Sequence, residues 1–406
     1  MFVRKTRETG LRTILFLLAL FSTWSSSMAQ KITTLNEAVQ IALANHPIAK
    51  NAELSVQNAK ASTLAFPYLE PIELNFIYGQ LHSVVYNKAF EISQNFGSPF
   101  TLYRNFKLGK EQIRLSETGQ AISIKQLTAI VKSAYMKWLF DDMMVRQNRH
   151  EAELYGDFEN YYPESENIPD SLMLEKATAQ SLYADVQRRM FIAEEELHYS
   201  TNQMQQLLFL NEAPVLSDTS MELYAVAAFN QGKDKFYPWT HIAYYEQMRK
   251  VKGYEVSLER SKLTPEIKGG YFNQEIEHLS GFKGYIIGLT FPLSFTTQFA
   301  KIKEAEINQK IAINELDYQK ISLQKTVENL QIRLNQYFVS ISYYRENALI
   351  EADVLLRSSL NLFASKKIKY QTYLENIAKA FKIKAAYLET VRLYNETAID
   401  LEHYIN

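Results

Sequence analysis

The distribution of proline and glycine constrains this chain more than any other feature of its sequence. No proline follows Pro292 and no glycine follows Gly288, although the chain continues to Asn406. In a helix interior, proline costs about 3 kcal/mol and glycine about 1 kcal/mol relative to alanine. The whole stretch after Pro292 is therefore predicted to be helical.

The first half of the chain shows the same pattern. Residues 101–162 contain no proline, and residues 171–212 contain neither proline nor glycine. The segment between them, YYPESENIPDS (161–171), holds two prolines and is predicted to be a turn, with Asp170 or Ser171 capping the second helix. At 1.5 Å per residue, a helix from Thr101 to Tyr162 would be roughly 90 Å long. Such a helix requires a coiled-coil-like partner.

An apolar heptad pattern predicts how the long helix after Pro292 packs. Its positions alternate in steps of four and three residues: Leu323, Val327, Leu330, Leu334, Tyr337, Ile341, Tyr344 and Ala348. This spacing is typical of a coiled-coil seam, and the tyrosines and alanine make it looser than a leucine zipper. A plain coiled-coil rod would explain the seam, but it would not explain the strand patterns described next.

A strand runs almost directly into this helix. Four apolar side chains occupy alternate positions, as in a β-strand: Tyr285, Ile287, Leu289 and Phe291. The residues between them are Ile286, Gly288 and Thr290. If the strand crosses a membrane, we expect the first set to face lipid and the second to face the lumen, because the reverse would leave the fully apolar set in water.

The same succession occurs earlier, which indicates an internal duplication. PIELNFIYGQ (71–80) and VVYNKAFEISQNFGSPF (84–100) correspond to PEIKGGYFNQ (265–274) and FKGYIIGLTFPLSF (282–295). Pro71 and Pro265 are separated by almost the same number of residues as Pro99 and Pro292. Each copy is predicted to contain a helix, two strands, a long helix, a turn and a further helix.

The predicted domain organisation follows from this duplication. A signal peptide is expected at 1–29, a linker at 213–238, and the two repeats at 30–212 and 239–406. The strands are expected within 67–98 and 264–293, and the tips of the helical hairpins near 160–172 and 363–373.

The N-terminal residues predict secretion. MFVRKTRETGLRTILFLLALFSTWSSSMAQ (1–30) has a basic start, an apolar run from Ile14 to Phe21, and a small-x-small site at Ser27-Met28-Ala29. These features are typical of a signal peptide, whereas a membrane anchor would need an apolar run of about 20 residues. The chain has no cysteine, so we expect no lipid anchor at the cleavage site, no disulfide and no thiolate metal site.

Composition argues against several functional classes. The formal net charge is −1, which does not suit nucleic-acid binding. The seven histidines are scattered without an HExxH or His-x-His pair, and no phosphate loop or GxSxG elbow is present. Carboxylate pairs such as Asp141-Asp142 lie in charge-mixed helical segments. The sequence therefore predicts no enzyme, and no catalytic, cofactor-binding or metal site.

Four strands per chain are too few to close a barrel, and an open sheet edge is not tolerated in lipid. Closure must come from other copies of the chain. Two copies would give eight strands around a filled interior, and three would give twelve around a lumen.

The ordered set of segments resembles the TolC family of outer-membrane efflux proteins over nearly the whole mature chain. The resemblance rests on the duplicated strand-to-helix pattern together with ITTLNEAVQIALANHP (32–47), YIIGLTFPLSF (285–295) and YLENIAKAFKIKAAYLETVRLYNETAIDLEHY (373–404). It implies a mainly α fold with a membrane β-barrel part, in which a homotrimer builds a 12-stranded barrel in outer-membrane lipid and long antiparallel helical hairpins build a periplasmic α-barrel. It also implies that the linker (211–239) contributes to a belt around the tunnel.

The resemblance further implies a function and partners. The chain would be the outer-membrane channel subunit of a tripartite efflux system in a Gram-negative bacterium, exporting small molecules or ions. Its partners would be a periplasmic adaptor (membrane fusion protein) and an inner-membrane pump.

Channels of this family are gated at the periplasmic tip, where the inner helix pair carries acidic residues. Aligning IKYQTYLENIAKA (368–380) with that turn places Glu375 near the first acid and Ala378 or Lys379 where a second is expected. Three lysines crowd the same turn, which departs from the acidic pattern: Lys366, Lys367 and Lys369. They suggest a ring of Lys–Glu pairs, although an ordinary surface role for Glu375 remains an equal alternative. In the first copy, the acids Glu164, Glu166 and Asp170 are expected to be turn and capping residues.

Two other functional classes stay open at this point. A periplasmic adaptor also uses a long helical hairpin, but it holds one hairpin within glycine-rich β domains. A structural coiled-coil protein of the envelope would leave the alternating strands unexplained. A requirement for detergent during extraction would favour the channel over both.

Overall fold

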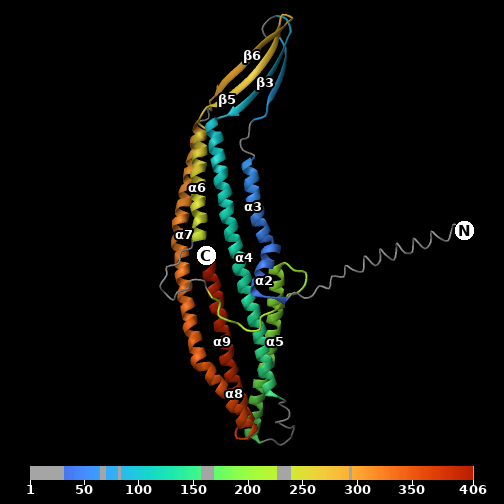
Figure 1. Cartoon of the computed structure of the whole chain (residues 1–406), viewed down its shortest axis with the longest axis vertical. Coiled ribbons are helices and arrows are strands. Elements are labelled where there is room, and N and C mark those ends of the chain that lie inside the picture. The colour runs from blue at the N-terminus through green and yellow to red at the C-terminus, as the bar shows by residue number, and fades with distance from the viewer. Residues whose placement is uncertain are drawn as a thin grey trace, which may run out of the picture.

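The computed structural model describes residues 32–64, 70–80, 84–156, 169–225, 239–291 and 295–405. The predicted signal peptide lies outside the described residues, as do Glu164 and Glu166. Figure 1 shows an elongated, mainly helical molecule with a small β-sheet at one end and helices running along its length. The C-terminus lies near the middle of the long axis. The expectation of a mainly α fold with a minor β part is confirmed.

The first half of the chain contains two short helices, two strands and two long helices. In order these are α2 (Leu35–Asn45), α3 (Pro47–Leu64), β2 (Glu73–Gly79), β3 (Asn87–Gly97), α4 (Pro99–Tyr155) and α5 (Asp170–Leu208). Thr34 and Glu37 form a capping box that starts α2, in which each side chain bonds the backbone N–H of the other residue. Pro47 begins α3, a position that suits a residue without an N–H.

The second half repeats this order after the linker. Its elements are α6 (Trp239–Ser261), β5 (Glu266–Ile276), β6 (Leu279–Thr290), α7 (Phe295–Tyr343), a π-helical turn η2 (Tyr344–Ala348), α8 (Leu349–Ala364) and α9 (Tyr370–Ile405). The short strands β1 (Ile32–Thr33) and β4 (Val215–Leu216) pair in parallel and join the start of the described chain to the linker.

The expected end of the first long helix was wrong. α4 has 57 residues and would be about 85 Å long, but it ends at Tyr155 rather than Tyr162. Gly156 follows with φ of 63° and ψ of −164°, a combination that is essentially restricted to glycine. The capping expectation for α5 was also wrong, because Pro169 takes the N-cap position and makes no side-chain cap. Asp170 is instead the first helical residue, where its charge suits the helix dipole.

The predicted seam of the long helix after Pro292 is confirmed on α7. Leu323, Val327, Leu334, Ile341 and Ala348 are buried. Val327, Leu334 and Ile341 share a core with Val391, Tyr394, Ala398 and Leu401 of α9. The π-helical turn interrupts this helix at Tyr344, a feature that no residue pattern predicted.

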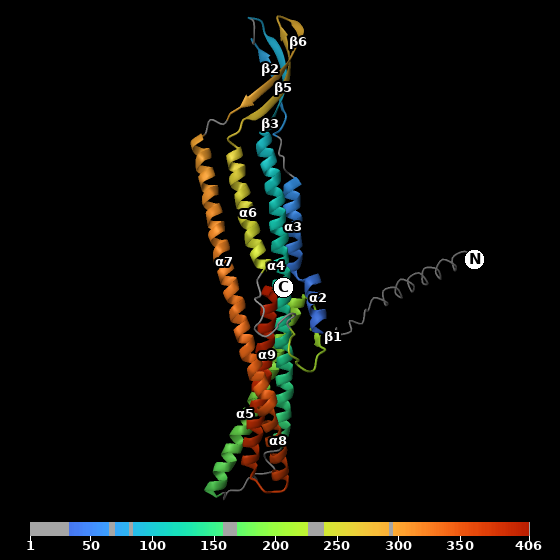
Figure 2. The same cartoon turned by 60° about the vertical axis from the view of Figure 1, so that its left-hand side comes forward.

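The helices form a curved wall, one layer thick near the sheet. In Figure 2 the four helices next to the sheet lie in the order α7, α6, α4 and α3, and neighbouring members pack against each other. Farther from the sheet, α4 packs against both α5 and α9, and α9 packs against α7 and α8. None of the described helices combines the length and the apolar composition needed to cross a lipid bilayer.

The sheet has the order β2-β3-β5-β6, with antiparallel neighbours. The order of the strands therefore matches the order of the helices that adjoin them. Within the described part of this chain, β2 and β6 each have one edge without a partner strand.

Candidate functional site: the sheet face and the helical tip

One face of the sheet is mainly apolar across all four strands. Tyr285, Ile287, Leu289 and Phe291 have exposed fractions of 83, 88, 60 and 58%. The register aligns Leu74 with Ile92, Ile92 with Tyr271, and Tyr271 with Tyr285, so these side chains share a face. Phe76, Tyr78, Phe90 and Ile267 lie on this face too, and so do four polar residues: Lys88, Gln94, Asn273 and Lys283. So large an exposed apolar patch is typical of a surface that contacts lipid or another protein.

The opposite face is mostly polar or lined by glycine. It carries Ile286, Gly288 and Thr290, the residues expected to face the lumen, beside Lys268 and Glu266 of the neighbouring strand. The polar side chains of this face bond to one another. Asn95 donates to Glu266 at 2.7 Å, and Ser93 donates to Glu73 at 3.3 Å. A strand set with one apolar and one hydrogen-bonded face is the pattern of a membrane barrel with a polar interior.

At the other end of the molecule, the turn between α8 and α9 carries the three predicted lysines. The N–H of Lys367 donates to Leu362 at 2.8 Å and that of Lys366 donates to Phe363 at 2.9 Å. These two bonds form the Schellman motif that closes a helix. Lys366 occupies its left-handed position with φ of 57°, where glycine is usual. Lys366 therefore has a conformational role in the turn.

Within this chain, Lys369 and Glu375 have separate partners. The Lys369 ammonium lies 2.9 Å from a carboxylate oxygen of Glu175 on α5, a residue that sequence reasoning missed. Glu375 instead accepts a hydrogen bond from Gln371, one turn earlier in α9, at 2.8 Å. A cavity of about 450 Å³ lies at this junction, and Glu175 and Lys366 are among the residues that line it.

Two tyrosines join the hairpins at the same level. The Tyr370 hydroxyl donates to the carbonyl of Tyr155, and the Tyr373 hydroxyl donates to that of Leu154 at 2.7 Å. These carbonyls belong to the last turn of α4, where a helix leaves acceptors without intrahelical partners. The tyrosines therefore complete the end of α4 and hold α9 against it.

A buried ion pair supports this contact. Glu151 is fully buried on α4, and both its oxygens accept hydrogen bonds from Arg189 of α5 at 2.8 Å. The hydrogen bond to Glu151 raises the pKa of Arg189. Burial, together with the Glu151 charge, raises the pKa of the Tyr155 hydroxyl, which donates to Glu151 at 3.1 Å. The two helices of the first hairpin are thus fixed to each other just before the tip.

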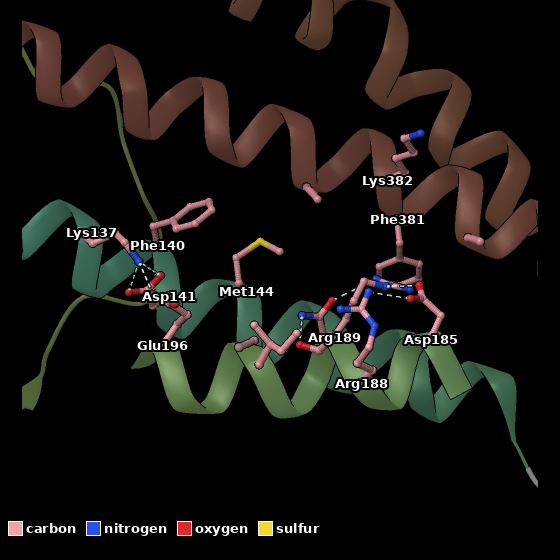
Figure 3. Close-up of a pocket in the computed structure, with 15 residues that line it drawn as sticks. Lys137, Phe140, Asp141, Met144, Asp185, Arg188, Arg189, Glu196, Phe381 and Lys382 are labelled. Carbon is pink, nitrogen blue, oxygen red and sulfur yellow. Dashed lines mark hydrogen bonds and ion pairs between the residues drawn. The ribbon is translucent and has the colours of Figure 1, made fainter. Parts of the chain in front are cut away.

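A groove of about 700 Å³ lies between α4, α5 and α9 (Figure 3). Phe140, Met144 and Phe381 point into it, while charged side chains stand along its margins. The charges pair with one another: Lys137 lies 2.6 Å from Asp141, and Arg189 lies 2.9 Å from Asp185. Such paired charges around apolar side chains are typical of a helix-packing surface.

Two of the scattered histidines come together near the middle of the molecule. The rings of His241 on α6 and His403 on α9 lie 4.8 Å apart, edge to face. The Nδ1 atoms of both rings are buried and have no hydrogen-bond partner among the described residues. Burial lowers the pKa of His241 to about 4, and the nearby His403 and Lys125 add to this shift. Their wide separation in the sequence gives no sign of this contact.

Several of these contacts could not be predicted from the sequence. Lys369 and Glu175 are 194 residues apart, and the partners of Tyr370 and Tyr373 are backbone carbonyls. The one available signal was the spacing of these tyrosines by three residues on a helix, which places both on one face.

Known proteins resemble this chain when structures are compared. No protein-family model matches the sequence, and no curated protein matches it. Among solved structures, the open-state MtrE outer-membrane channel of Neisseria gonorrhoeae has a TM-score of 0.75 at 14% identity, covering 91% of this chain and 88% of that chain. The CmeC outer-membrane channel of Campylobacter jejuni has a TM-score of 0.74 at 11% identity, covering 94% and 89%.

The outer-membrane protein VceC of Vibrio cholerae has a TM-score of 0.70 at 13% identity, covering 91% of this chain and 94% of that chain. These matches extend over the sheet and the helices alike, because each covers more than nine tenths of the present chain. The chain therefore has the fold of the TolC-like outer-membrane channels, as its sequence resemblance implies.

Proposed function

We propose that this protein is the outer-membrane channel subunit of a tripartite efflux system and exports small molecules or ions. The observation that carries the proposal is the four-stranded sheet, which is apolar on one face, polar on the other and unpaired at β2 and β6. An unpaired edge is tolerated in lipid only if another strand completes it. Neither a coiled-coil rod nor an adaptor hairpin would explain such a sheet.

Three copies would close the barrel. Joining β6 of one copy to β2 of the next gives twelve strands, enough to enclose a lumen. The helical wall supports the same arrangement, because its edge helix α7, continued by α8, carries an exposed apolar stripe: Ile311, Tyr318, Ile332, Val339, Ile350 and Val354. A neighbouring copy would cover this stripe, and the assembled walls would form a periplasmic α-barrel.

The repeated order of elements supports the proposed internal duplication, with repeats at 30–212 and 239–406 joined by the linker 213–238. In the assembly, Tyr285, Ile287, Leu289 and Phe291 would face lipid. The sheet would lie in the outer membrane and the helices in the periplasm. There, an adaptor and an inner-membrane pump would complete the system.

The tip of the α-barrel would be the gate. We assign it to Lys366, Lys367, Lys369 and Glu375, and add Glu175. In a trimer each of these residues is repeated around the axis, so that one side chain becomes a ring of charges. The Lys369–Glu175 pair and the tyrosine contacts to α4 would hold the tip closed, and an adaptor would open it by separating the hairpins.

Assembly and conductance test the proposal. The mature protein, extracted in mild detergent, should have the mass of three chains by light scattering. It should also form discrete conducting channels in planar lipid bilayers. A folded, monodisperse monomer in detergent would overturn the trimer, and a trimer that never conducts would overturn the channel.

A further inference from the structure

The first three turns of α4, directly below the sheet, expose an aromatic and basic face. Phe100, Tyr103 and Phe106 are exposed there. Lysines lie over two of the rings: Lys107 is 5.5 Å from the centre of Tyr103, and Lys110 is 4.4 Å from that of Phe106. The Arg104 guanidinium also lies 5.9 Å from the Tyr103 ring. The aromatic rings and the cations therefore form one continuous surface, here called the α4 collar.

The end of α3 and the start of α4 carry charge of a single sign. Residues 54–64 of α3 and 99–110 of α4 together contain four basic residues and no acidic one. The basic residues are Lys60, Arg104, Lys107 and Lys110. The first acidic residue of α4 is Glu111, whose carboxylate accepts a hydrogen bond from Gln247 of α6 at 2.7 Å.

The α4 collar stays open when the wall closes. α4 contacts α3 near Gly109, where an added Cβ would lie 2.7 Å from Thr63, and it contacts α6 through Thr101, which donates to the Ser261 carbonyl at 3.1 Å. Both neighbours lie inside the same chain. A second copy would add to the edges of the wall, at α3 and α7, and would leave the collar uncovered.

We propose that the α4 collar binds the anionic headgroups of the membrane leaflet that surrounds the base of the barrel. The inference rests on the proposed function, since it requires the sheet to lie in lipid. β3 ends at Gly97 and α4 begins at Pro99, so the collar continues directly from the strand into the headgroup region. Aromatic rings are favoured at that depth, and long basic side chains reach back toward it. Their charges complement phosphate, and the collar would fix the depth of the barrel.

Lipid selectivity tests the proposal. The purified mature protein in detergent is incubated with equal amounts of phosphatidylglycerol and phosphatidylcholine, and the retained lipids are counted by native mass spectrometry. Each basic residue near an anionic surface strengthens association about fivefold, so the parent should retain phosphatidylglycerol preferentially. The variant Arg104→Gln/Lys107→Gln/Lys110→Gln should lose most of this preference.

The control removes the same charge elsewhere. Lys50→Gln/Lys250→Gln/Lys310→Gln changes three exposed basic residues that lie outside the collar and should keep the parent's preference. Equal loss in both variants would overturn the site. Because the collar variant could fail to assemble, the parent is also measured in low and high salt, where the preference should fall as salt screens the charges. A preference that does not change with salt would overturn the proposal.

Two further measurements distinguish lipid binding from the binding of free phosphate, and failure of the collar from failure of the proposed function. Soluble glycerol phosphate should not displace the lipid, and displacement would mean that the collar recognises a free phosphate instead. Channel conductance is recorded from the same preparation. A protein that conducts but shows no lipid preference overturns the collar alone, whereas one that neither inserts nor conducts overturns the proposed function.

Discussion

Lys369 and Glu175 join the two helical hairpins of this chain across 194 residues of sequence, with 2.9 Å between the lysine ammonium and a carboxylate oxygen. The Glu175 side chain is mostly buried, whereas that of Lys369 is largely exposed. An exposed pair is worth at most about 1 kcal/mol. Threefold repetition in a trimer would add such contributions, which suits a gate that a protein partner must be able to open.

Reversing the charge at Glu175 should therefore open the tip. Glu175→Lys places two cations together, and we expect a severalfold rise in the resting conductance of the purified channel in planar bilayers. The swapped variant Glu175→Lys/Lys369→Glu restores the attraction and should return the conductance toward that of the parent. A swapped variant that conducts as strongly as Glu175→Lys would show that the pair does not hold the tip.

Glu375 is the second position at which reversal should open the channel. Glu375→Lys adds a cation beside the lysine turn in every copy, and we expect raised conductance and greater sensitivity of cells to large antibiotics. Glu351→Lys, on the exposed face of α8, is the matched control. If Glu375→Lys conducts like the parent while reversal at Glu164 or Glu166 opens the pore, the constriction belongs to the turn of the first copy.

Lys366 should be replaceable by glycine with a gain in stability. A left-handed backbone costs a residue with a Cβ roughly 1–2 kcal/mol, and Lys366 has φ of 57°. We expect Lys366→Gly to stabilise the tip by about 1 kcal/mol, seen as slower hydrogen exchange in α8 and α9. Lys367→Gly removes the same charge without this benefit and should not slow exchange. Equal behaviour of the two variants would contradict the conformational role.

The membrane face can be tested at two adjacent residues. Leu289 lies on the apolar face and Thr290 on the polar face of β6. Leu289→Arg should cost about 2–4 kcal/mol if it lies near the bilayer midplane, and should reduce the amount of trimer recovered from the outer membrane. Thr290→Arg should assemble normally. Equal recovery of both variants would mean that this strand does not face lipid as proposed.

Periodic features of this fold could be predicted, because one face of an element keeps the same environment, buried or exposed, over many residues. The seam from Leu323 to Ala348 and the alternation from Tyr285 to Phe291 are of this kind. Features that depend on a single residue were harder to predict from the sequence. The end of α4 depends on Gly156 rather than on the prolines that follow, and the π-helical turn at Tyr344 has no characteristic residue pattern.

The candidate gate was only partly predictable for a different reason. The lysine turn is a local feature and is visible in the sequence. Its partner Glu175 is buried by the packing of α5 against the second hairpin, which depends on how two long helices cross. The same holds for His241 and His403, whose contact requires α6 and α9 to meet near the middle of the molecule.

That histidine pair predicts a dependence of stability on pH. Burial lowers the pKa of His241 in the folded protein to about 4, from an ordinary value of 6.5. Burial also lowers the pKa of His403. The groups around them are Lys125 of α4, Tyr244 and Tyr245 of α6, and Tyr404 of α9. Glu402 of α9 lines the same cavity as His403, but its carboxylate is paired with Lys132 at 2.7 Å, so a proton on either ring would be poorly compensated.

The unfolded chain binds a proton on His241 below pH 6.5, whereas the folded chain does so only near pH 4. Stability is therefore complete above pH 6.5 and is lost as the pH falls toward 4, by about 2 kcal/mol at pH 5 from His241 alone. His241→Phe keeps a buried ring and removes this titration. We expect the melting temperature of the parent to fall between pH 7.5 and pH 5 by several degrees more than that of His241→Phe. Carboxylates elsewhere titrate alike in both proteins, so parallel melting curves across this range would show that the pair is not buried as a neutral contact.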